Sequence, residues 1–240
     1  MSLTILIPCK NEELIIEDTV SILLDEFNKT QIEFEIILIN DFSTDQTETN
    51  LAKLQKENNK VVYLNNNISG IGNAITTGIQ NAKNEFLVIF MSDMSDDIED
   101  LKKYYYTIKD ENIDCVFGSR FSKESKIVNY PIFKYILNRI FNIFVKIIFF
   151  SNYNDFTNAF KIYKVSTLKK LLPIVSENFN TFLELPLKII SRKYKYKVIP
   201  INWYNRKKGK SKFNIKELTS KYIFTLIYCF LEKNLLKKRK

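Results

Sequence analysis

The sequence predicts an α/β fold in which helices cover both faces of a mostly parallel central sheet. Short, unbroken apolar runs alternate, over the first half of the chain, with longer segments in which apolar residues recur every three or four positions. The first pattern is typical of strands and the second of amphipathic helices. Strands that alternate with helices pair in parallel, and strands buried on both faces lack polar alternation. Both observations therefore favour a parallel sheet between two helical layers.

Five strands and four helices are expected in the first half of the chain. The first strand lies at residues 3–8, where Pro8 ends an apolar run. The remaining apolar runs predict strands at residues 34–41, 61–64, 86–91 and 114–118. The spacing of apolar residues predicts helices at residues 11–27, 45–58, 70–82 and 96–109, and Asp45 is a candidate N-cap.

Beyond residue 125 the alternation gives way to long apolar helices and a single strand, expected at residues 196–201. The segment 131–150 (PIFKYILNRIFNIFVKIIFF) is amphipathic, because its polar residues gather in one arc of a helix. These residues are Lys134, Asn138, Arg139, Asn142 and Lys146. Such a helix suits a membrane interface. A core helix with one wetted side is the alternative. Neither this segment nor the apolar run at 222–231 is long and uninterrupted enough to span a bilayer.

Composition excludes several kinds of catalytic site. The 240 residues include no histidine, which rules out Ser-His and Cys-His nucleophile pairs and histidine metal sites. The three cysteines are odd in number and widely spaced, so they form neither a disulfide framework nor a zinc ligand set. They fit a reducing compartment, and the first residues lack the features of a signal peptide. We therefore expect a cytoplasmic protein.

Charge divides the chain into two unlike parts. Residues 1–100 carry 18 acidic and 6 basic side chains, whereas residues 101–240 carry 9 acidic and 30 basic ones. The basic part is expected to meet an anionic partner. Nucleic acid, an anionic membrane and a phosphorylated small molecule all satisfy this expectation, and a generally lysine-rich surface is the simplest alternative.

Acidic and polar residues follow three of the predicted strands, at residues 8–13, 40–45 and 92–97. Ligands of open α/β sheets bind beyond the carboxyl ends of the strands, so we expect these loops to converge on one crevice. Carboxylates repel a bare diphosphate, but a divalent cation between them makes the crevice attractive. Asp41 and Asp93 lie at strand ends and are the preferred functional candidates, whereas Asp45 and Asp97 are better explained as N-caps.

Glycine is scarce, with five in the chain, so each is expected where a side chain does not fit. Gly70 and Gly72 precede a predicted helix, where the backbone can approach a ligand closely. The pair lacks the third glycine of a dinucleotide-binding fingerprint, which argues against a nicotinamide enzyme.

Six motifs occur in order along the chain: IPCKNEE, LINDFSTDQT, SGIGNAITTGIQNA, MSDMSDDIEDL, FGSRF and RKKGKSKF. Together they resemble family 2 of the inverting glycosyltransferases, and most closely its dolichol-phosphate mannose synthase-like branch. The resemblance implies a GT-A fold and the transfer of a hexose from a GDP- or UDP-sugar to a polyprenyl phosphate for cell-surface glycan synthesis. It implies a GT-A domain at residues 1–213, with 131–150 as an inserted interfacial helix, followed by a helix and basic tail at 214–240.

The same resemblance implies roles for individual residues. Donor binding falls to Pro8, Lys10, Glu12, Asp41, Gly70, Ser92, Lys161 and Ser211. Binding of the acceptor phosphate falls to Arg120, Lys134, Asn138 and Arg139. The catalytic positions are Asp93, Arg120, Arg206 and Lys212, and the last two belong to a loop that closes over the diphosphate.

The implied cofactor is Mg²⁺ or Mn²⁺, held by Asp93 and Ser95. Met91 stands at the first position of the family's D-x-D motif, where a carboxylate is usual, so the requirement for a metal is left open. Asp93 with Ser95 or Asp96 offers the cation fewer carboxylates than the family pattern does.

The reaction develops positive charge on the sugar and negative charge on the departing diphosphate. Cations near the diphosphate stabilise that change, and losing one such contact raises the barrier by about 2.7–4 kcal/mol. A phosphate acceptor is already anionic near neutral pH, so it needs no general base. A saccharide hydroxyl would need one. Glu184 is the late candidate for that base, unless it is a helix-surface residue.

Two other function classes compete with this reading. One is a glycosyltransferase that adds a sugar to a saccharide hydroxyl during polysaccharide or lipopolysaccharide assembly. The other is a nucleic-acid-binding module, suggested by six basic residues at 206–216. That stretch carries no RNA-binding signature, so we expect no nucleic-acid partner.

We expect the chain to associate peripherally with the cytoplasmic face of a membrane. The tail KNLLKKRK would favour this, because each basic residue near an anionic surface contributes about 1 kcal/mol. A homo-oligomer that buries the apolar helix faces is the competing arrangement.

Overall fold

The computed structural model describes residues 1–205 and 215–235. Its main sheet has seven strands in the order β3-β2-β1-β4-β7-β5-β8. They are β1 (Ser2–Cys9), β2 (Glu33–Asn40), β3 (Val61–Asn65), β4 (Phe86–Ile89), β5 (Cys115–Ser119), β7 (Lys161–Lys164) and β8 (Tyr196–Pro200). β7 is antiparallel to both of its neighbours, and all other pairs in this sheet are parallel. The predicted mostly parallel sheet is confirmed.

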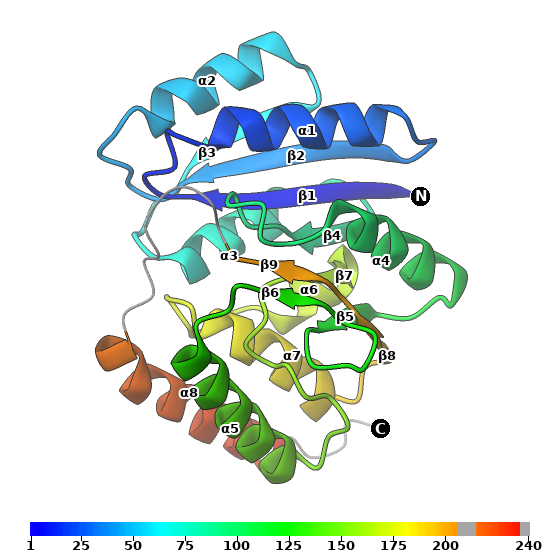
Figure 1. Cartoon of the computed structure of the whole chain (residues 1–240), viewed down its shortest axis with the longest axis vertical. Helices are drawn as coiled ribbons and strands as arrows, with labels where there is room; N and C mark the ends of the chain where they lie inside the picture. The colour runs from blue at the N-terminus through cyan, green and yellow to red at the C-terminus, as the bar shows by residue number, and fades with distance from the viewer. Residues whose placement is uncertain (206–214, 236–240) are drawn as a thin grey trace.

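Helices cover both faces of this sheet (Figure 1). One face carries α1 (Ile16–Asn28), α2 (Thr47–Glu57) and α4 (Ile98–Asp110). The other carries α3 (Ile71–Asn81), α5 (Ile132–Phe149), α6 (Val165–Leu171), α7 (Thr181–Ser191) and α8 (Ile215–Leu235). Within β2, Ile36 and Leu38 pack in the first layer and Ile37 and Ile39 in the second. This burial on both sides explains why the strands show no polar alternation.

The five strands expected before residue 120 are all present, but α1 begins at Ile16 rather than at residue 11. Asn11 has a positive φ of 50°. The carbonyl of Glu12 accepts hydrogen bonds from the backbone N–H groups of Ile15 and Ile16. Residues 11–15 therefore form a turn beyond β1 instead of a first helical turn.

The expectation of a single strand after residue 125 is wrong. The structure has β8 there, but also β6 (Ile127–Val128), β7 and β9 (Trp203–Tyr204). β7 has the sequence KIYK, which is too short and too basic to stand out as an apolar run, and its pairing with β4 and β5 defines it as a strand. β6 and β9 pair with each other in parallel, and Trp203 of β9 bridges to Asp96. This small sheet links the segment after β5 to the loop after β4.

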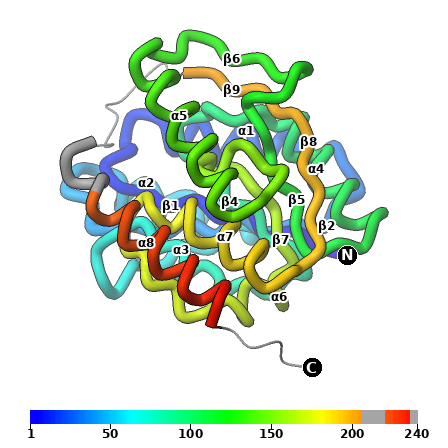
Figure 2. The backbone as a smooth tube through the Cα atoms, turned by 90° about the horizontal axis from the view of Figure 1, so that it is seen from below, coloured from blue at the N-terminus to red at the C-terminus, as the bar shows by residue number. Residues whose placement is uncertain are grey.

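α5 and α8 lie side by side and run in the same direction, at the end of the molecule away from α1 and α2 (Figures 1 and 2). The ring centroids of Phe141 and Tyr222 are 5.6 Å apart, and those of Phe149 and Phe230 are 6.4 Å apart. Lys233 Nζ donates to the carbonyl of Phe149 at 2.9 Å. Within residues 1–205 and 215–235, no helix has the length and apolar character needed to cross a membrane.

Candidate active site

The first two polar loops are tied together at the carboxyl edge of the sheet. The backbone N–H of Asn11 donates to the hydroxyl of Ser43 at 3.0 Å. The N–H of Glu12 donates to the hydroxyl of Thr47 at 2.7 Å. Both Glu12 and the preceding Pro8 are buried. The predicted convergence of these two loops is therefore confirmed.

The third loop, after β4, borders the same crevice. β2 and β3 extend the sheet on one side of β1, and β4 lies on the other side. Such a switch point leaves a crevice beyond the strand ends, where ligands bind. α1 holds this loop, because the hydroxyl of Thr19 donates to the carbonyl of the buried Ser92 at 2.7 Å.

Asp41 organises the second loop from a buried position. Its Oδ1 accepts hydrogen bonds from Asn66 Nδ2 at 2.9 Å and from the N–H of Gly70 at 2.8 Å. Lys10 Nζ lies 3.7 Å from Oδ2 of Asp41 and donates to the hydroxyl of Ser69 at 3.3 Å. The side chain of Lys10 is 42% exposed, so its ammonium group is accessible beside the carboxylate that holds it.

The two glycines after β3 make room for another backbone segment. A Cβ on Gly70 would lie 2.4 Å from the carbonyl oxygen of Glu177, and one on Gly72 would lie 1.9 Å from that of Ser176. Gly70 also has a φ of +127°, which side chains rarely allow. The N–H of Gly72 donates to the carbonyl of Glu177 at 2.8 Å. Glycine is therefore required at both positions because the backbone of residues 176 and 177 lies directly against them. We call residues 176 and 177 the wall behind this loop.

Asp93 lies in the third loop, and its Oδ1 accepts a hydrogen bond from the N–H of Ser95 at 3.1 Å. The carbonyl of Ser95 accepts from the N–H of Tyr204 at 2.9 Å, so β9 supports the loop. Met91 packs against the core and offers no hard ligand. In the described ranges no three His, Cys, Asp or Glu side chains surround a common metal position. The oxygens of Asp93 and Ser95 still suit a cation that is held by few protein ligands and completes its shell with substrate phosphates.

The capping role expected for Asp97 is confirmed. Asp97 is the N-cap of α4, and its Oδ1 accepts from the N–H of Glu99 at 2.9 Å. Asp45 lies one residue before the N-cap of α2, which is Gln46. Its carboxylate nevertheless accepts from the N–H of Thr47 at 3.0 Å, so it satisfies an N–H group in the first turn.

Arg120, at the end of β5, is held by a carboxylate that the sequence analysis did not identify. The fully buried Asp155 accepts hydrogen bonds from the backbone N–H of Arg120 at 2.9 Å, from its Nε at 2.8 Å and from its Nη2 at 2.6 Å. Burial would lower the pKa of Arg120, but Asp155 outweighs burial and raises it. The sequence offered one indication of Asp155, because acidic residues are rare in this part of the chain. Asp155 is one of nine acidic residues after residue 100.

Lys161 belongs to the same buried group of charges. Its Nζ donates to the carbonyl of Phe156 at 3.1 Å and to that of Asn158. Burial lowers the pKa of Lys161 to about 7, although Asp155 acts in the opposite direction. With 1% of its surface exposed, Lys161 is enclosed by protein groups.

Asp96 connects this cluster to the third loop. Burial and, after it, the neighbouring Asp93 raise the pKa of Asp96 to about 8, although Arg120 and Lys161 act in the opposite direction. Asp96 therefore lies within electrostatic reach of a predicted metal ligand and of a predicted acceptor ligand. The structure thus brings together residues of two motifs, MSDMSDDIEDL and FGSRF, with the more distant Lys161.

An aromatic wall lies beside Arg120; it consists of Phe121, Tyr130, Tyr135 and Trp203. The guanidinium of Arg120 lies 5.4 Å from the ring centroid of Phe121, and that of Arg139 lies 4.4 Å from the same centroid. Nη1 of Arg139 is buried and has no hydrogen-bond partner within the described residues. Two of the predicted acceptor ligands, Arg120 and Arg139, therefore share one site.

α5 turns its polar arc toward the protein. Asn142 is fully buried, with its Oδ1 accepting from the N–H of Phe156 at 2.6 Å and its Nδ2 donating to the carbonyl of Asn138 at 2.9 Å. Nδ2 of Asn138 donates to the hydroxyl of Tyr130 at 3.2 Å. Lys134 is half-buried one turn earlier. The polar arc is therefore not the side of α5 that faces solvent.

The apolar arcs of α5 and α8 are exposed, and we call them together the α5–α8 face. On α5 and its C-cap the exposed residues are Ile132, Phe133, Ile136, Leu137, Ile140, Ile143, Phe144, Ile147 and Phe150. On α8 they are Ile223, Phe224, Ile227, Phe230, Leu231 and Leu235. The same helices carry Lys134, Lys146, Lys221 and Lys233. An exposed apolar patch with a polar rim marks an interaction site.

Four other predicted residues need separate mention. Arg206, Ser211 and Lys212 lie outside the described residues. Glu184 lies in α7 and is fully buried, so its interpretation as a helix-surface residue is wrong.

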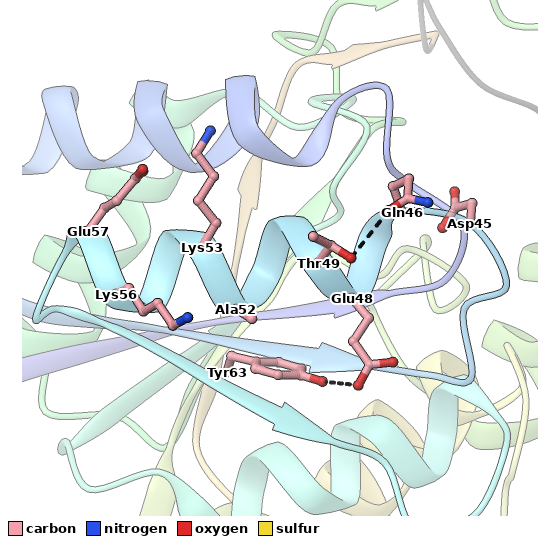
Figure 3. Close-up of a pocket in the computed structure, with 9 residues that line it drawn as sticks. All are labelled: Asp45, Gln46, Glu48, Thr49, Ala52, Lys53, Lys56, Glu57 and Tyr63. Carbon is pink, nitrogen blue, oxygen red and sulfur yellow. Dashed lines mark hydrogen bonds between the residues drawn. The ribbon is translucent and has the colours of Figure 1, made fainter.

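A pocket of about 700 Å³ lies at the β3 edge of the sheet (Figure 3). It is lined by α2 and by Tyr63 of β3, whose hydroxyl donates to Glu48 Oε1 at 2.6 Å. Lys53 of α2 pairs with Glu17 of α1 at 2.9 Å. None of the predicted site residues lines this pocket, so we assign it no part in the site.

Sequence comparison relates the chain to known proteins. The pattern of Glycosyl transferase family 2 matches residues 4–172. Glycosyltransferase AglD of Haloferax volcanii is 22% identical over 220 residues, which cover 90% of this chain and 35% of that protein. Dolichol-phosphate mannosyltransferase of Pyrococcus furiosus is 24% identical over 139 residues, which cover 58% of this chain and 39% of that protein. The chain thus spans well under half the length of either relative.

The fold is similar to that of glucosyl-3-phosphoglycerate synthase from Mycobacterium tuberculosis, solved in complex with Mn²⁺, UDP-glucose and phosphoglyceric acid. The TM-score is 0.68 at 14% sequence identity, and the match covers 99% of this chain and 81% of that one. At this identity the similarity concerns the fold alone.

Proposed function

Because the chain belongs to glycosyltransferase family 2 and has a GT-A fold, we propose that it is a nucleotide-sugar-dependent glycosyltransferase whose acceptor is a polyprenyl phosphate. The donor is a GDP- or UDP-hexose, and the product serves cell-surface glycan synthesis. The donor half is supported by a fold shared with a protein that binds UDP-glucose. The acceptor half is supported by similarity to a dolichol-phosphate mannosyltransferase.

The donor's nucleoside is proposed to lie against the first two loops, where Lys10 is accessible beside Asp41. Its diphosphate then reaches the third loop at Asp93. Arg206, Ser211 and Lys212 keep their proposed role of closing over the diphosphate.

Mg²⁺ or Mn²⁺ is the proposed cofactor, since the similar solved structure holds Mn²⁺. Asp93 and Ser95 would hold the ion together with diphosphate oxygens, which suits a site with one carboxylate. When bound, such a cation neutralises the negative charge that develops on the leaving diphosphate.

One observation carries the acceptor proposal: α5 joins a cationic site to an apolar face. Its inner arc places Arg139, with a buried and unpartnered Nη1, at the same aromatic ring as Arg120. A buried guanidinium N–H without an acceptor is costly, and a phosphate oxygen would satisfy it. The outer arc of the helix belongs to the exposed α5–α8 face. A polyprenyl phosphate has the same two parts, an anionic head and an apolar chain.

The chemistry follows from this acceptor. An anionic phosphate oxygen forms a bond to C1 of the sugar while the bond from C1 to the diphosphate breaks, so the configuration at C1 inverts. No general base is required, because the second pKa of a phosphomonoester is about 6. Glu184, the base considered for a saccharide acceptor, is sequestered, since its two oxygens accept from the N–H groups of Val175 at 3.0 Å and Ser176 at 2.8 Å.

We also propose that the α5–α8 face rests on the cytoplasmic surface of a membrane with anionic lipids. Its apolar side chains would enter the interface, and Lys221, an exposed lysine of α8, would meet the headgroups. Such a lysine contributes about 1 kcal/mol near an anionic surface. A second copy of the chain on this face is the competing outcome, and a rise in molecular mass without vesicles would reveal it.

The decisive experiment incubates the protein with vesicles containing polyprenyl phosphate and with radiolabelled GDP- and UDP-sugars, with and without Mg²⁺ or Mn²⁺. We expect label to enter the organic phase with at least one donor. Label that reaches only a soluble saccharide, in the absence of lipid, would instead establish the hydroxyl-acceptor alternative.

Arg139→Ala tests the acceptor site separately. Losing one hydrogen bond to a charged group costs about 1.5–3 kcal/mol, so the KM for polyprenyl phosphate should rise roughly tenfold to a hundredfold while the donor KM stays unchanged. Lys146→Ala, two turns further along the same arc, is the matched control and should have little effect. Equal rises in both KM values would contradict the assignment of Arg139.

A further inference from the structure

The wall behind the donor loop is itself held in place from α7. Residues 176 and 177 contact the backbone of Gly70 and Gly72 so closely that neither glycine could carry a Cβ. Gly70 in turn donates its N–H to Asp41 at 2.8 Å, and Asp41 lies beside Lys10. Any displacement of residues 176 and 177 is therefore transmitted by direct contact to the groups proposed to meet the nucleoside.

A buried ion pair fixes the segment before this wall. Glu184 and Lys188, one turn apart on α7, are both fully enclosed, and Lys188 Nζ lies 2.6 Å from Glu184 Oε1. Glu184 accepts from the N–H groups of Val175 and Ser176. Lys188 donates to the carbonyls of residues 171 and 173, at 3.2 and 2.7 Å. The hydrogen bonds of this pair thus go to the backbone of residues 171–176.

A second contact reaches the wall from α8. The hydroxyls of Ser176 and Thr225 lie 3.1 Å apart, and Asn180 Nδ2 donates to Thr225 at 2.9 Å. Thr225 is fully buried. Ser176 is therefore held through its backbone by Glu184 and through its side chain by α8.

We propose that Glu184 and Lys188 are positioning residues for the donor: they set where residues 176 and 177 press on the Gly70 loop, and so set the affinity for the nucleoside diphosphate. This inference rests on the proposed function. A buried ion pair is weak grounds for a stabilising role, because its desolvation offsets its attraction. What distinguishes this pair is that its hydrogen bonds end on residues 171–176, the segment whose last residue packs against Gly72.

Glu184→Gln tests the inference, because it keeps the size of the side chain and removes its charge. We expect the dissociation constants for GDP or UDP, and the donor KM, to rise about tenfold, the loss of a contact worth about 1.4 kcal/mol. The kcat and the acceptor KM should change less than about twofold. Calorimetric titration with the nucleoside diphosphate alone gives the affinity without any transfer reaction.

Glu232→Gln is the matched control. Glu232 of α8 is also a largely buried carboxylate paired with a cation, since Nε of Arg192, the C-cap of α7, lies 2.6 Å from its Oε1. Within the described residues Glu232 has no hydrogen bond or ion pair with residues 176 and 177, so nucleotide affinity should be unchanged. Wild-type nucleotide affinity in a folded Glu184→Gln, or the same loss in both variants, would overturn the positioning role.

Gly72→Ala decides the matter should Glu184→Gln not fold. Its new Cβ would meet the Ser176 carbonyl at 1.9 Å and push the wall from the opposite side. We expect the same loss of nucleotide affinity with kcat retained, and unchanged affinity would overturn the inference. A wild-type protein that binds no nucleoside diphosphate would overturn the proposed function along with it, and the wild-type titration shows that failure separately from a failure of the variants.

Discussion

Asp155→Asn is the substitution whose effect follows most directly from the structure. Asp155 has no exposed surface and accepts three hydrogen bonds from Arg120, which is itself 7% exposed. Asparagine keeps the shape of the side chain but removes its charge. Its Nδ2, a hydrogen-bond donor, would face the N–H donors of Arg120. The guanidinium would then remain buried without a counter-ion.

The magnitude follows from that burial. Breaking a buried pair by removing one partner costs about 3–5 kcal/mol, because the remaining charge is uncompensated. For a chain of this length, each kcal/mol lowers Tm by about 2–4 °C, so the expected loss is about 6–20 °C. Transfer should fall as well, since Asp155 fixes the orientation of a proposed acceptor ligand.

Urea unfolding followed by circular dichroism measures the free energy, and label transfer measures activity. Glu17→Gln is the control, because its pair with Lys53 at 2.9 Å is largely exposed and should contribute less than about 1 kcal/mol. If Asp155→Asn lowered the free energy of unfolding only as much as Glu17→Gln does, the claim that Asp155 compensates the buried charge of Arg120 would be refuted.

The remaining predictions concern the metal ligand and the buried lysine. Asp93→Ala should lower kcat by roughly 10²–10³ without changing the unfolding midpoint, and unchanged turnover would remove Asp93 from the site. Burial lowers the pKa of Lys161 from 10.5 to about 7, so its stabilising contribution is present above pH 10.5 and is lost as pH falls to about 7. As the pH falls from 10.5 to about 7, the free energy of unfolding of the wild type should therefore decrease relative to that of Lys161→Met. Below about pH 7 the difference between the two should stay constant. Urea unfolding between about pH 6 and 10 measures the difference, and a difference that does not vary with pH would show that Lys161 has its usual pKa.

The sequence alone determined the layered α/β arrangement and the edge at which the site lies. Apolar runs and helical spacing are local properties, so they predicted β1 to β5 and the helices between them. Once parallel pairing was inferred, the loops at Lys10, Asp41 and Asp93 had to meet at one edge. The order of the six motifs added the family, and with it a role for residues such as Arg139, which periodicity had placed only in the polar arc of a helix.

Only the tertiary structure decided which distant residues meet. Asp155 lies 35 positions from Arg120, and β7 is recognisable as a strand only between β4 and β5. Helical periodicity showed which residues of α5 share an arc, but not that the polar arc faces inward and the apolar arc outward. It also gave no sign that Glu184 reaches back to the N–H groups of residues 175 and 176. The physical reason is that periodicity records the conformation of neighbouring residues, whereas pairing and burial depend on how the whole chain closes around them.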